Sequence, residues 1–369
     1  MRFLSILASL VFVPLTFAVN VVYVSFAGEK RIAIYQIDPR EGRLTRVGNL
    51  STTGEPGALT IDSKQRFLFA ALRSTGELAA FRIDPATGKL THINTVPAGA
   101  DPAHISVDKD GKFLLTAYYV AGQVTVHRIA DDGALSKEPR QTFKTKEKAH
   151  AIVIDPRELA VLIPHTGPNV IYALWWHGKS GEISRPGIGF ESFETPKNSG
   201  PRHVVFHPTL MIHGPIDADA QVAYVVNEQG GSVTMYHAIL NPINWLLEAK
   251  QAISTLPAEY KATNACAEIR LHPSNRYLYV SNRGHDSIAA FRIEKKSGEL
   301  TSLGQTPTEK TPRSFDVDPS GKFLFAAGES SGKLAAYRIN EGSGLLERTA
   351  TYEVGKKPWW VMATKLPSK

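Results

Sequence analysis

A single unit of sequence recurs seven times along the chain, and this recurrence restricts the fold more than any other feature. Its clearest copies begin at Gly111, Arg276 and Gly321. Each contains an alternating apolar run that ends in Asp-Pro or a similar pair, a turn, an aromatic-Leu-aromatic strand and a second alternating strand that ends near Arg-Ile. An equivalent position in the seven units falls at Gly57, Ala103, His150, Arg202, Ala267, Arg313 and Trp359, in steps of 46, 47, 52, 65, 46 and 46 residues.

The apolar residues within each unit recur at every second position, which is the period of β-strands and excludes a helical solenoid. Four strands per unit at this spacing indicate a propeller blade. The sequence therefore predicts an all-β fold, a seven-bladed β-propeller with four-stranded antiparallel blades. The first unit, from Val21, lacks the opening strand of the others, and Lys357 to Ala363 supply it at the other end. We expect this C-terminal strand to close the ring in the N-terminal blade, because closure leaves no free sheet edge.

The N-terminal segment has the pattern of a secretory signal peptide, with one Arg, a run of mostly apolar residues and small residues up to Ala18. The predicted organisation is a signal peptide over 1–18 and a propeller domain over 19–369. A buried first strand is the alternative, but strand alternation begins only at Val21. We expect an exported protein, periplasmic or secreted, or a cytoplasmic one if the segment is not cleaved. Cys266 is the only cysteine, so no internal disulfide can form.

The charge of the chain argues against nucleic acid as a partner. The formal net charge is +7, but the Lys and Arg residues are scattered through turns without a basic run. An anionic or polyhydroxylated small molecule is the better expectation. No second apolar segment approaches membrane length, so we expect no membrane association after cleavage, and we expect a monomer.

Two sets of positions should converge on one mouth of the central channel. The seven equivalent positions given above start the inner strands, and a second set follows the second strands at Ala27, Arg73, Tyr119, His165, Glu228, Arg283 and Glu329. These fourteen positions hold four Arg, two His and two Glu. In a chain that is 21% charged, about three charged residues would be expected there. This excess is the strongest functional signal in the repeat pattern.

The residue types at this mouth predict chemistry on a carbonyl or an anion. Arg202 and Arg313 each follow a Pro, which restricts where the guanidinium can lie, and a planar guanidinium suits carboxylate and phosphate. Structural pairing of each Arg with an Asp or Glu of a neighbouring blade is the alternative. We expect His150, titrating near neutral pH, to transfer the proton, and Glu228 to remain a carboxylate that orients an arginine or the substrate.

Other histidines and motifs carry less weight. His203, His207 and His272 lie elsewhere on inner strands or in turns and are expected to be structural. No His, Cys and Asp cluster has metal-ligand spacing, so neither a metal nor another cofactor is predicted. The one Gly-x-Ser-x-Gly match, from Gly328 to Gly332, lies in a turn between two predicted strands and so lacks the strand-to-helix setting of a nucleophile elbow, and the sequence contains no phosphate-binding P-loop.

With these residues in view, the chain resembles the lactonase family of seven-bladed propellers over its whole length after the signal segment. This family includes the propeller-type 6-phosphogluconolactonase of bacteria and the carboxymuconate lactonizing enzyme of fungi. The most specific stretches are GPRHVVFHP from Gly200, VVNE from Val225, LYVSNR from Leu278 and TPRSFDVDPSGKFLFAAG from Thr311. The resemblance implies catalytic roles for His150, Arg202, Glu228 and Arg283. The residues predicted to bind substrate are Arg313, Arg73, Asn227, Asn282 and Tyr119.

The family resemblance implies hydrolysis of a gluconic-type δ-lactone, glucono-1,5-lactone or its 6-phosphate, to the aldonic acid. Export favours the unphosphorylated lactone, because the phosphorylated one is a cytosolic intermediate. Two alternatives stay open. One is a carboxymuconate lactonizing or cycloisomerizing activity, and the other is a non-catalytic propeller that binds a ligand or a protein.

Overall fold

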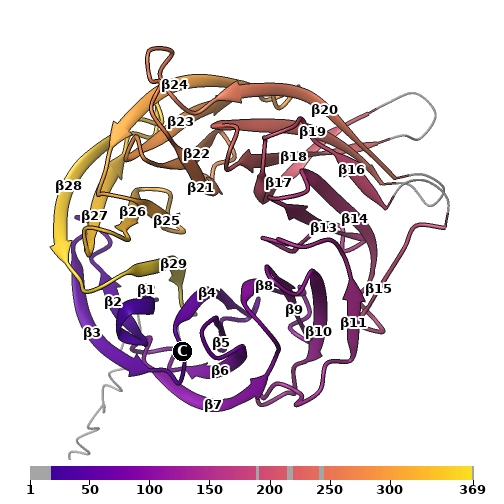
Figure 1. Ribbon diagram of the computed structural model, residues 1–369. Coiled ribbons are helices and arrows are strands. Elements are labelled where there is room, and N and C mark those ends of the chain that lie inside the picture. The colour runs from indigo at the N-terminus through magenta and orange to yellow at the C-terminus, as the bar shows by residue number, and fades with distance from the viewer. Residues whose placement is uncertain (1–17, 188–190, 214–218, 241–244, 368–369) are drawn as a thin grey trace, which may run out of the picture.

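The computed structural model describes residues 18–187, 191–213, 219–240 and 245–367. Seven antiparallel sheets surround a central channel, and the chain passes once around the ring from the indigo N-terminal strands to the yellow C-terminal ones (Figure 1). The prediction of a seven-bladed propeller is confirmed. Within the described ranges the one helical element is the short 3₁₀ turn η1 (Ala27–Glu29), and no helix there is long and apolar enough to cross a membrane.

We number the blades in chain order and give their strands from the channel outward. Blades 1 to 3 comprise β4 (Pro56–Ile61), β5 (Phe67–Leu72), β6 (Glu77–Ile83) and β7 (Leu90–Pro97); β8 (Pro102–Val107), β9 (Phe113–Tyr118), β10 (Gln123–Arg128) and β11 (Gln141–Lys144); and β12 (Val153–Ile154), β13 (Ala160–His165), β14 (Val170–His177), β15 (Glu182–Ser184) and β16 (Ser192–Glu194). Blades 4 and 5 comprise β17 (Pro201–Ile212), β18 (Ala220–Asn227), β19 (Ser232–Leu240) and β20 (Trp245–Ser254); and β21 (Ala265–Leu271), β22 (Tyr277–Arg283), β23 (Ser287–Ile293) and β24 (Leu300–Pro307). Blades 6 and 7 comprise β25 (Pro312–Val317), β26 (Phe323–Gly328), β27 (Lys333–Ile339) and β28 (Leu346–Glu353); and β29 (Pro358–Lys365), β1 (Asn20–Phe26), β2 (Arg31–Ile37) and β3 (Leu44–Ser51).

Blade 7 contains both ends of the described chain, as the sequence predicts. Strand β29 pairs antiparallel with β1, with Ala363 opposite Val22 and Met362 opposite Tyr23. Strand β29 is the innermost strand of blade 7, so the C-terminal and N-terminal strands share one sheet and the ring is closed.

Blade 3 departs from the predicted four strands. Its outer strand is divided into β15, which pairs with Trp175 to His177 of β14, and β16, which pairs with Val170 to Tyr172. Pro186 follows β15 and has no N–H to donate, so it cannot continue the ladder.

The repeated Asp explains why the first turn of each unit is so regular. In four blades its carboxylate accepts the backbone N–H groups that open the second strand, at Asp62, Asp108, Asp155 and Asp318. In blades 4 and 5 a histidine stands in this turn, and the Nδ1 atoms of His207 and His272 accept backbone N–H groups instead. These two histidines are structural, as predicted.

Neighbouring blades are held together where the Gly of one turn meets an aromatic ring of the preceding blade. Gly344, in the turn between β27 and β28, has a φ of +76°, and a Cβ there would lie 2.4 Å from Cδ1 of Tyr277 on β22. The Tyr279 hydroxyl of the same strand donates to the Gly344 carbonyl at 2.8 Å. The aromatic-Leu-aromatic pattern and the glycine turn are therefore two halves of one contact between blades.

The variant Gly344→Ala is expected to lower the free energy of unfolding by about 1–3 kcal/mol, because the methyl group overpacks the Tyr277 ring and the residue keeps a left-handed backbone. Denaturant unfolding followed by fluorescence measures this change. Gly342→Ala is the matched control, since its Cβ would meet only Asn340 Oδ1 at 3.5 Å. Equal stability of the two variants would contradict this account.

Candidate active site

The inner strand of each blade starts with a β-bulge. In blade 4, Pro201 pairs with Asn227 and His203 with Val226, so Arg202 between them is an extra residue without a ladder partner. The same one-residue excess occurs at the equivalent place of the other six inner strands. Bulges redirect side chains and are frequent beside active sites. Six of the seven predicted inner-strand positions line one cavity at the mouth of the channel: Gly57, Ala103, His150, Arg202, Arg313 and Trp359.

Residues that follow the second strands complete the mouth, but the sequence prediction is wrong by one residue in blade 3. His165 is the last paired residue of β13 and is fully buried, with its ring against Tyr172. The residue equivalent to Arg73 and Glu329 is Thr166. Because side chains alternate between the two faces of a strand, a shift of one residue moves a side chain from the mouth into the blade.

The same alternation removes two asparagines from the predicted substrate site. Asn227 and Asn282 occupy the position of His165 in their blades and are buried. The Asn227 amide donates to Ser232 and Thr234, and the Asn282 amide donates to the Thr255 carbonyl at 3.0 Å. These side chains hold strands together and do not line the mouth, so we do not retain them as substrate ligands.

Arg202, Glu228 and Arg283 form a connected group at one side of the mouth. Glu228 Oε2 lies 2.9 Å from Arg202 Nε and 3.3 Å from Arg283 Nη2. The Nε–H of Arg202 is not aligned for a hydrogen bond with that oxygen, so the contact is an ion pair. Backbone carbonyls at the bulge of β21 fix both guanidinium groups, since Ala267 accepts from Arg202 and Cys266 accepts from Arg283. Burial and the charge of Arg283 lower the pKa of Arg202 to about 9, and it remains a cation at neutral pH.

His150 is 6% exposed and lies next to this group. Its ring packs edge-on against Tyr119, with centroids 5.5 Å apart, and Nδ1 has no hydrogen-bond partner. Burial, followed by the positive charge of Arg202, holds the pKa of His150 well below 6.5. The expectation of an imidazole that titrates near neutral pH is therefore wrong, and the physical reason is desolvation of the charged form. His150 is a neutral imidazole at pH 7.

Arg73, Arg313 and Trp359 form the other side of the mouth. The guanidinium carbons of Arg313 and Arg73 lie 4.8 and 5.5 Å from the Trp359 ring centroid. Each arginine has a carboxylate partner, at 3.6 Å from Arg313 to Glu329 and at 2.5 Å from Arg73 to Asp101. Asp101 precedes β8 of the neighbouring blade 2, whereas Glu329 follows β26 of the blade that holds Arg313, so the Arg313 pair is not the cross-blade pairing that the sequence left open. Both guanidinium groups also contact the Trp359 ring.

The floor of the mouth contains residues that the sequence analysis missed. His203, expected to be structural, lies on the channel side of β17 and lines the mouth together with Trp360. Its Nδ1 is 2.9 Å from Oε1 of Glu268, which is 1% exposed. Both follow the bulged residue of their strand by one position. That shared register was the signal that could have identified them.

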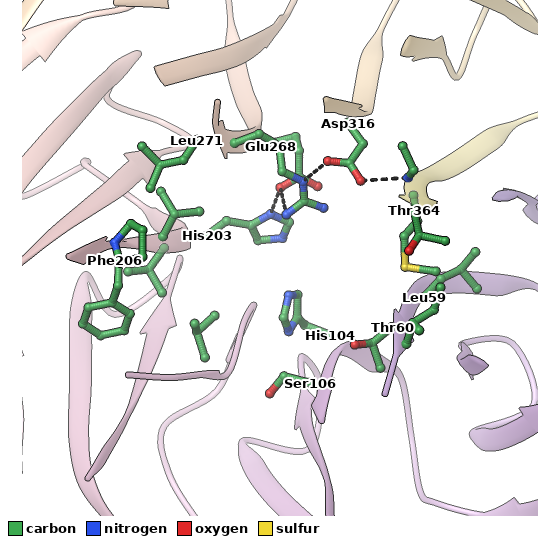
Figure 2. A pocket seen from close by; sticks show the side chains of 18 of the residues that line it. Leu59, Thr60, His104, Ser106, His203, Phe206, Glu268, Leu271, Asp316 and Thr364 are labelled. Atoms are coloured by element: carbon green, nitrogen blue, oxygen red, sulfur yellow. Dashed lines mark hydrogen bonds and ion pairs between the residues drawn. The ribbon is translucent and has the colours of Figure 1, made fainter. Parts of the chain in front are cut away.

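The floor separates the mouth from a second cavity of about 660 Å³ at the opposite end of the channel. Figure 2 shows His203 and His104 near the middle of this cavity, with Glu268 and Asp316 to one side. Arg270 connects the two carboxylates, at 3.5 Å from Glu268 and 3.2 Å from Asp316. The arginines of the mouth do not line this larger space, so the two cavities are chemically distinct.

Metal ligation finds no support in the described ranges, where no three His, Cys, Asp or Glu side chains gather in an arrangement that could hold an ion.

Comparison with known proteins agrees with this fold. Residues 21–363 match the family described as lactonase, 7-bladed beta-propeller. A 6-phosphogluconolactonase of Pectobacterium carotovorum is 32% identical over 344 residues, covering 93% of this chain and 85% of that protein, and one of an Enterobacter species is 33% identical over 340 residues, covering 92% and 84%. The periplasmic gluconolactonase of Pseudomonas aeruginosa has a similar structure, with a TM-score of 0.82, 23% identity and coverage of 95% and 100%. The chain belongs to the lactonase family of seven-bladed β-propellers.

Proposed function

We propose that the protein hydrolyses a gluconic-type sugar δ-lactone to the aldonic acid. The observation that carries this proposal is a neutral, buried imidazole with a free ring nitrogen beside two arginines that share one carboxylate. The curated relatives named 6-phosphogluconolactonase, at 32–33% identity over most of the chain, support the same reaction class.

The proposed reaction needs one proton acceptor and one site for negative charge. His150 takes a proton from water as the water oxygen adds to the lactone carbonyl carbon. The carbonyl oxygen becomes an oxyanion, and Arg202 and Arg283 stabilise it. The bond between the carbonyl carbon and the ring oxygen then breaks, and the His150 imidazolium returns the proton to that oxygen. Glu228 orients the two guanidinium groups, and Trp359 provides a flat surface for the sugar carbons.

The charges of the mouth favour a substrate without a phosphate. Four arginines face three carboxylates, Asp101, Glu228 and Glu329, and His150 is neutral, so the formal balance is +1. One net positive charge matches the single negative charge that develops when water adds to an uncharged lactone. The same balance disfavours a tricarboxylate such as a carboxymuconate.

A panel of glucono-1,5-lactone, its 6-phosphate and a muconolactone, assayed by pH-stat above the spontaneous rate, tests the proposal. We expect acceleration with glucono-1,5-lactone and a lower kcat/KM with the 6-phosphate. Preference for the 6-phosphate would contradict the charge argument but not the proposed lactone hydrolysis. No acceleration with any lactone, together with tight binding of a ligand, would indicate the non-catalytic alternative.

Export of the protein belongs to the same proposal. Residues 1–17, which form most of the predicted signal peptide, lie outside the described residues. We expect the mature protein from its native host to begin after Ala18, and N-terminal sequencing checks this. A protein that begins at Met1 would contradict export and would favour the phosphorylated substrate.

A further inference from the structure

His203 and Glu268 lie directly behind Arg202, in a part of the channel floor where almost no solvent reaches. Glu268 Oε1 accepts from His203 Nδ1 at 2.9 Å and from the backbone N–H of Ile269 at 3.1 Å. Because His203 Nδ1 donates its proton to Glu268, the neutral ring has its lone pair on Nε2. Nη1 of Arg202 lies 3.3 Å from that nitrogen and 3.4 Å from Nδ1, so it approaches the nitrogen-bearing side of the ring from its face. The one ring nitrogen that can accept a hydrogen bond is therefore in contact with the guanidinium group, although not along its lone pair.

The His203 ring also contacts the other group that the reaction uses. Its centroid is 5.2 Å from that of His150, at an interplanar angle of 64°. His203 is 4% exposed, so its position is set by packing and by Glu268. One side chain thus touches both Arg202 and His150.

We propose that the Glu268–His203 pair is a positioning unit that holds the Arg202 guanidinium and the His150 ring in their reactive arrangement. This inference rests on the proposed lactone hydrolysis and names two residues that act through others, without contact to the reacting atoms.

A neutral acceptor suits this task better than a second carboxylate would. Arg202 and Arg283 are like charges that share Glu228, and the Ala267 carbonyl already accepts from Arg202 Nη1, so His203 is an additional uncharged contact of that same nitrogen. Another carboxylate would neutralise the cation and weaken its effect on an oxyanion. His203 supplies a lone pair without charge, because burial lowers its pKa to about 4. The negative charge of Glu268 is compensated from behind by Arg270, which also faces Asp316.

The test compares two substitutions of His203 that separate its packing from its hydrogen bonds. His203→Phe keeps an aromatic ring against His150 but removes both hydrogen bonds, and we expect kcat to fall by about 10²-fold, as for a misplaced reactive group. His203→Gln offers an acceptor near the position of Nε2, and we expect it to recover at least about 10-fold of that loss. The assay uses glucono-1,5-lactone and the full chain.

His104→Phe is the matched control. His104 occupies the equivalent position of blade 2, is 9% exposed and contacts both the Trp360 ring and the His203 ring, but its Nδ1 accepts from the Ile152 backbone N–H and, unlike His203, it lines the second cavity only. We expect its kcat to stay close to that of the unmodified protein. Melting temperatures are measured for all four proteins. If His203 is purely structural, kcat falls in step with the melting temperature. If it positions the reactive groups, the kcat of His203→Gln is higher than the kcat of His203→Phe, whichever of the two variants is the more stable.

Two failures can be told apart. If the unmodified protein hydrolyses the lactone and His203→Phe is no slower than His104→Phe, the positioning role is wrong and the proposed function stands. If no lactone is hydrolysed, the proposed function fails, and a crystal structure of His203→Phe then tests the positioning role. Displacement of the Arg202 guanidinium from Glu228 in that structure would support positioning, and an unchanged ion pair would overturn it.

Discussion

His150→Ala is expected to lower kcat on glucono-1,5-lactone by about 10²–10⁴-fold with little change in KM, as for the loss of a general base. The His150 side chain lies in the mouth cavity, and its free Nδ1 shows that at least one ring nitrogen is uncommitted. Steady-state kinetics above the spontaneous hydrolysis rate measure the loss. The control is His92→Ala, which removes an exposed imidazole from the outer strand β7.

The pH profile of the unmodified protein gives an independent check on His150. A general base must be unprotonated, and burial together with Arg202 keeps the pKa of His150 well below 6.5. The acid limb of kcat/KM is therefore expected below pH 6.5, with a constant rate from there to neutral pH. Glu228→Gln should affect KM more than kcat. If Glu228→Gln instead abolishes turnover while His150→Ala is nearly silent, Glu228 is the base.

Arg202→Lys is expected to lower kcat by about 10²–10³-fold, the loss typical of one oxyanion donor. The planar guanidinium contacts Glu228 and the Ala267 carbonyl from different nitrogens at once, and a single ammonium group cannot reproduce that arrangement. Arg292→Lys, at an exposed arginine of β23, is the control for the substitution itself. A rise in KM at constant kcat would show that Arg202 only binds the substrate.

The fold could be predicted almost completely from the sequence, because each blade repeats the same local information. Alternation sets the strands, the Asp turn sets the first hairpin, and a glycine such as Gly344 meets the aromatic strand of the preceding blade. The exception is the divided outer strand of blade 3, whose step of 52 residues is longer than the usual 46 or 47.

The candidate site could be predicted only where the spacing of the repeats fixed the place of a residue in its strand. His150, Arg202 and Arg313 follow from spacing, and the structure brings them to one cavity. The misplacement of His165 came from a shift of one residue, which reverses the direction of a strand side chain. The depressed pKa of His150 could not be foreseen, because desolvation depends on which rings and charges enclose a group in three dimensions.

The bulges have a consequence for how such a protein can change. A side chain at a bulge has no partner in the ladder, so its identity is largely independent of the pairing that builds the blade. The ring of bulged positions already holds residues as different as Gly57, Ala103, Arg313 and Trp359. Evolution, or a combinatorial library, can therefore vary this ring for new substrates while the seven sheets remain intact. Gly57 and Ala103, two small residues that line the mouth cavity, are the natural places to begin.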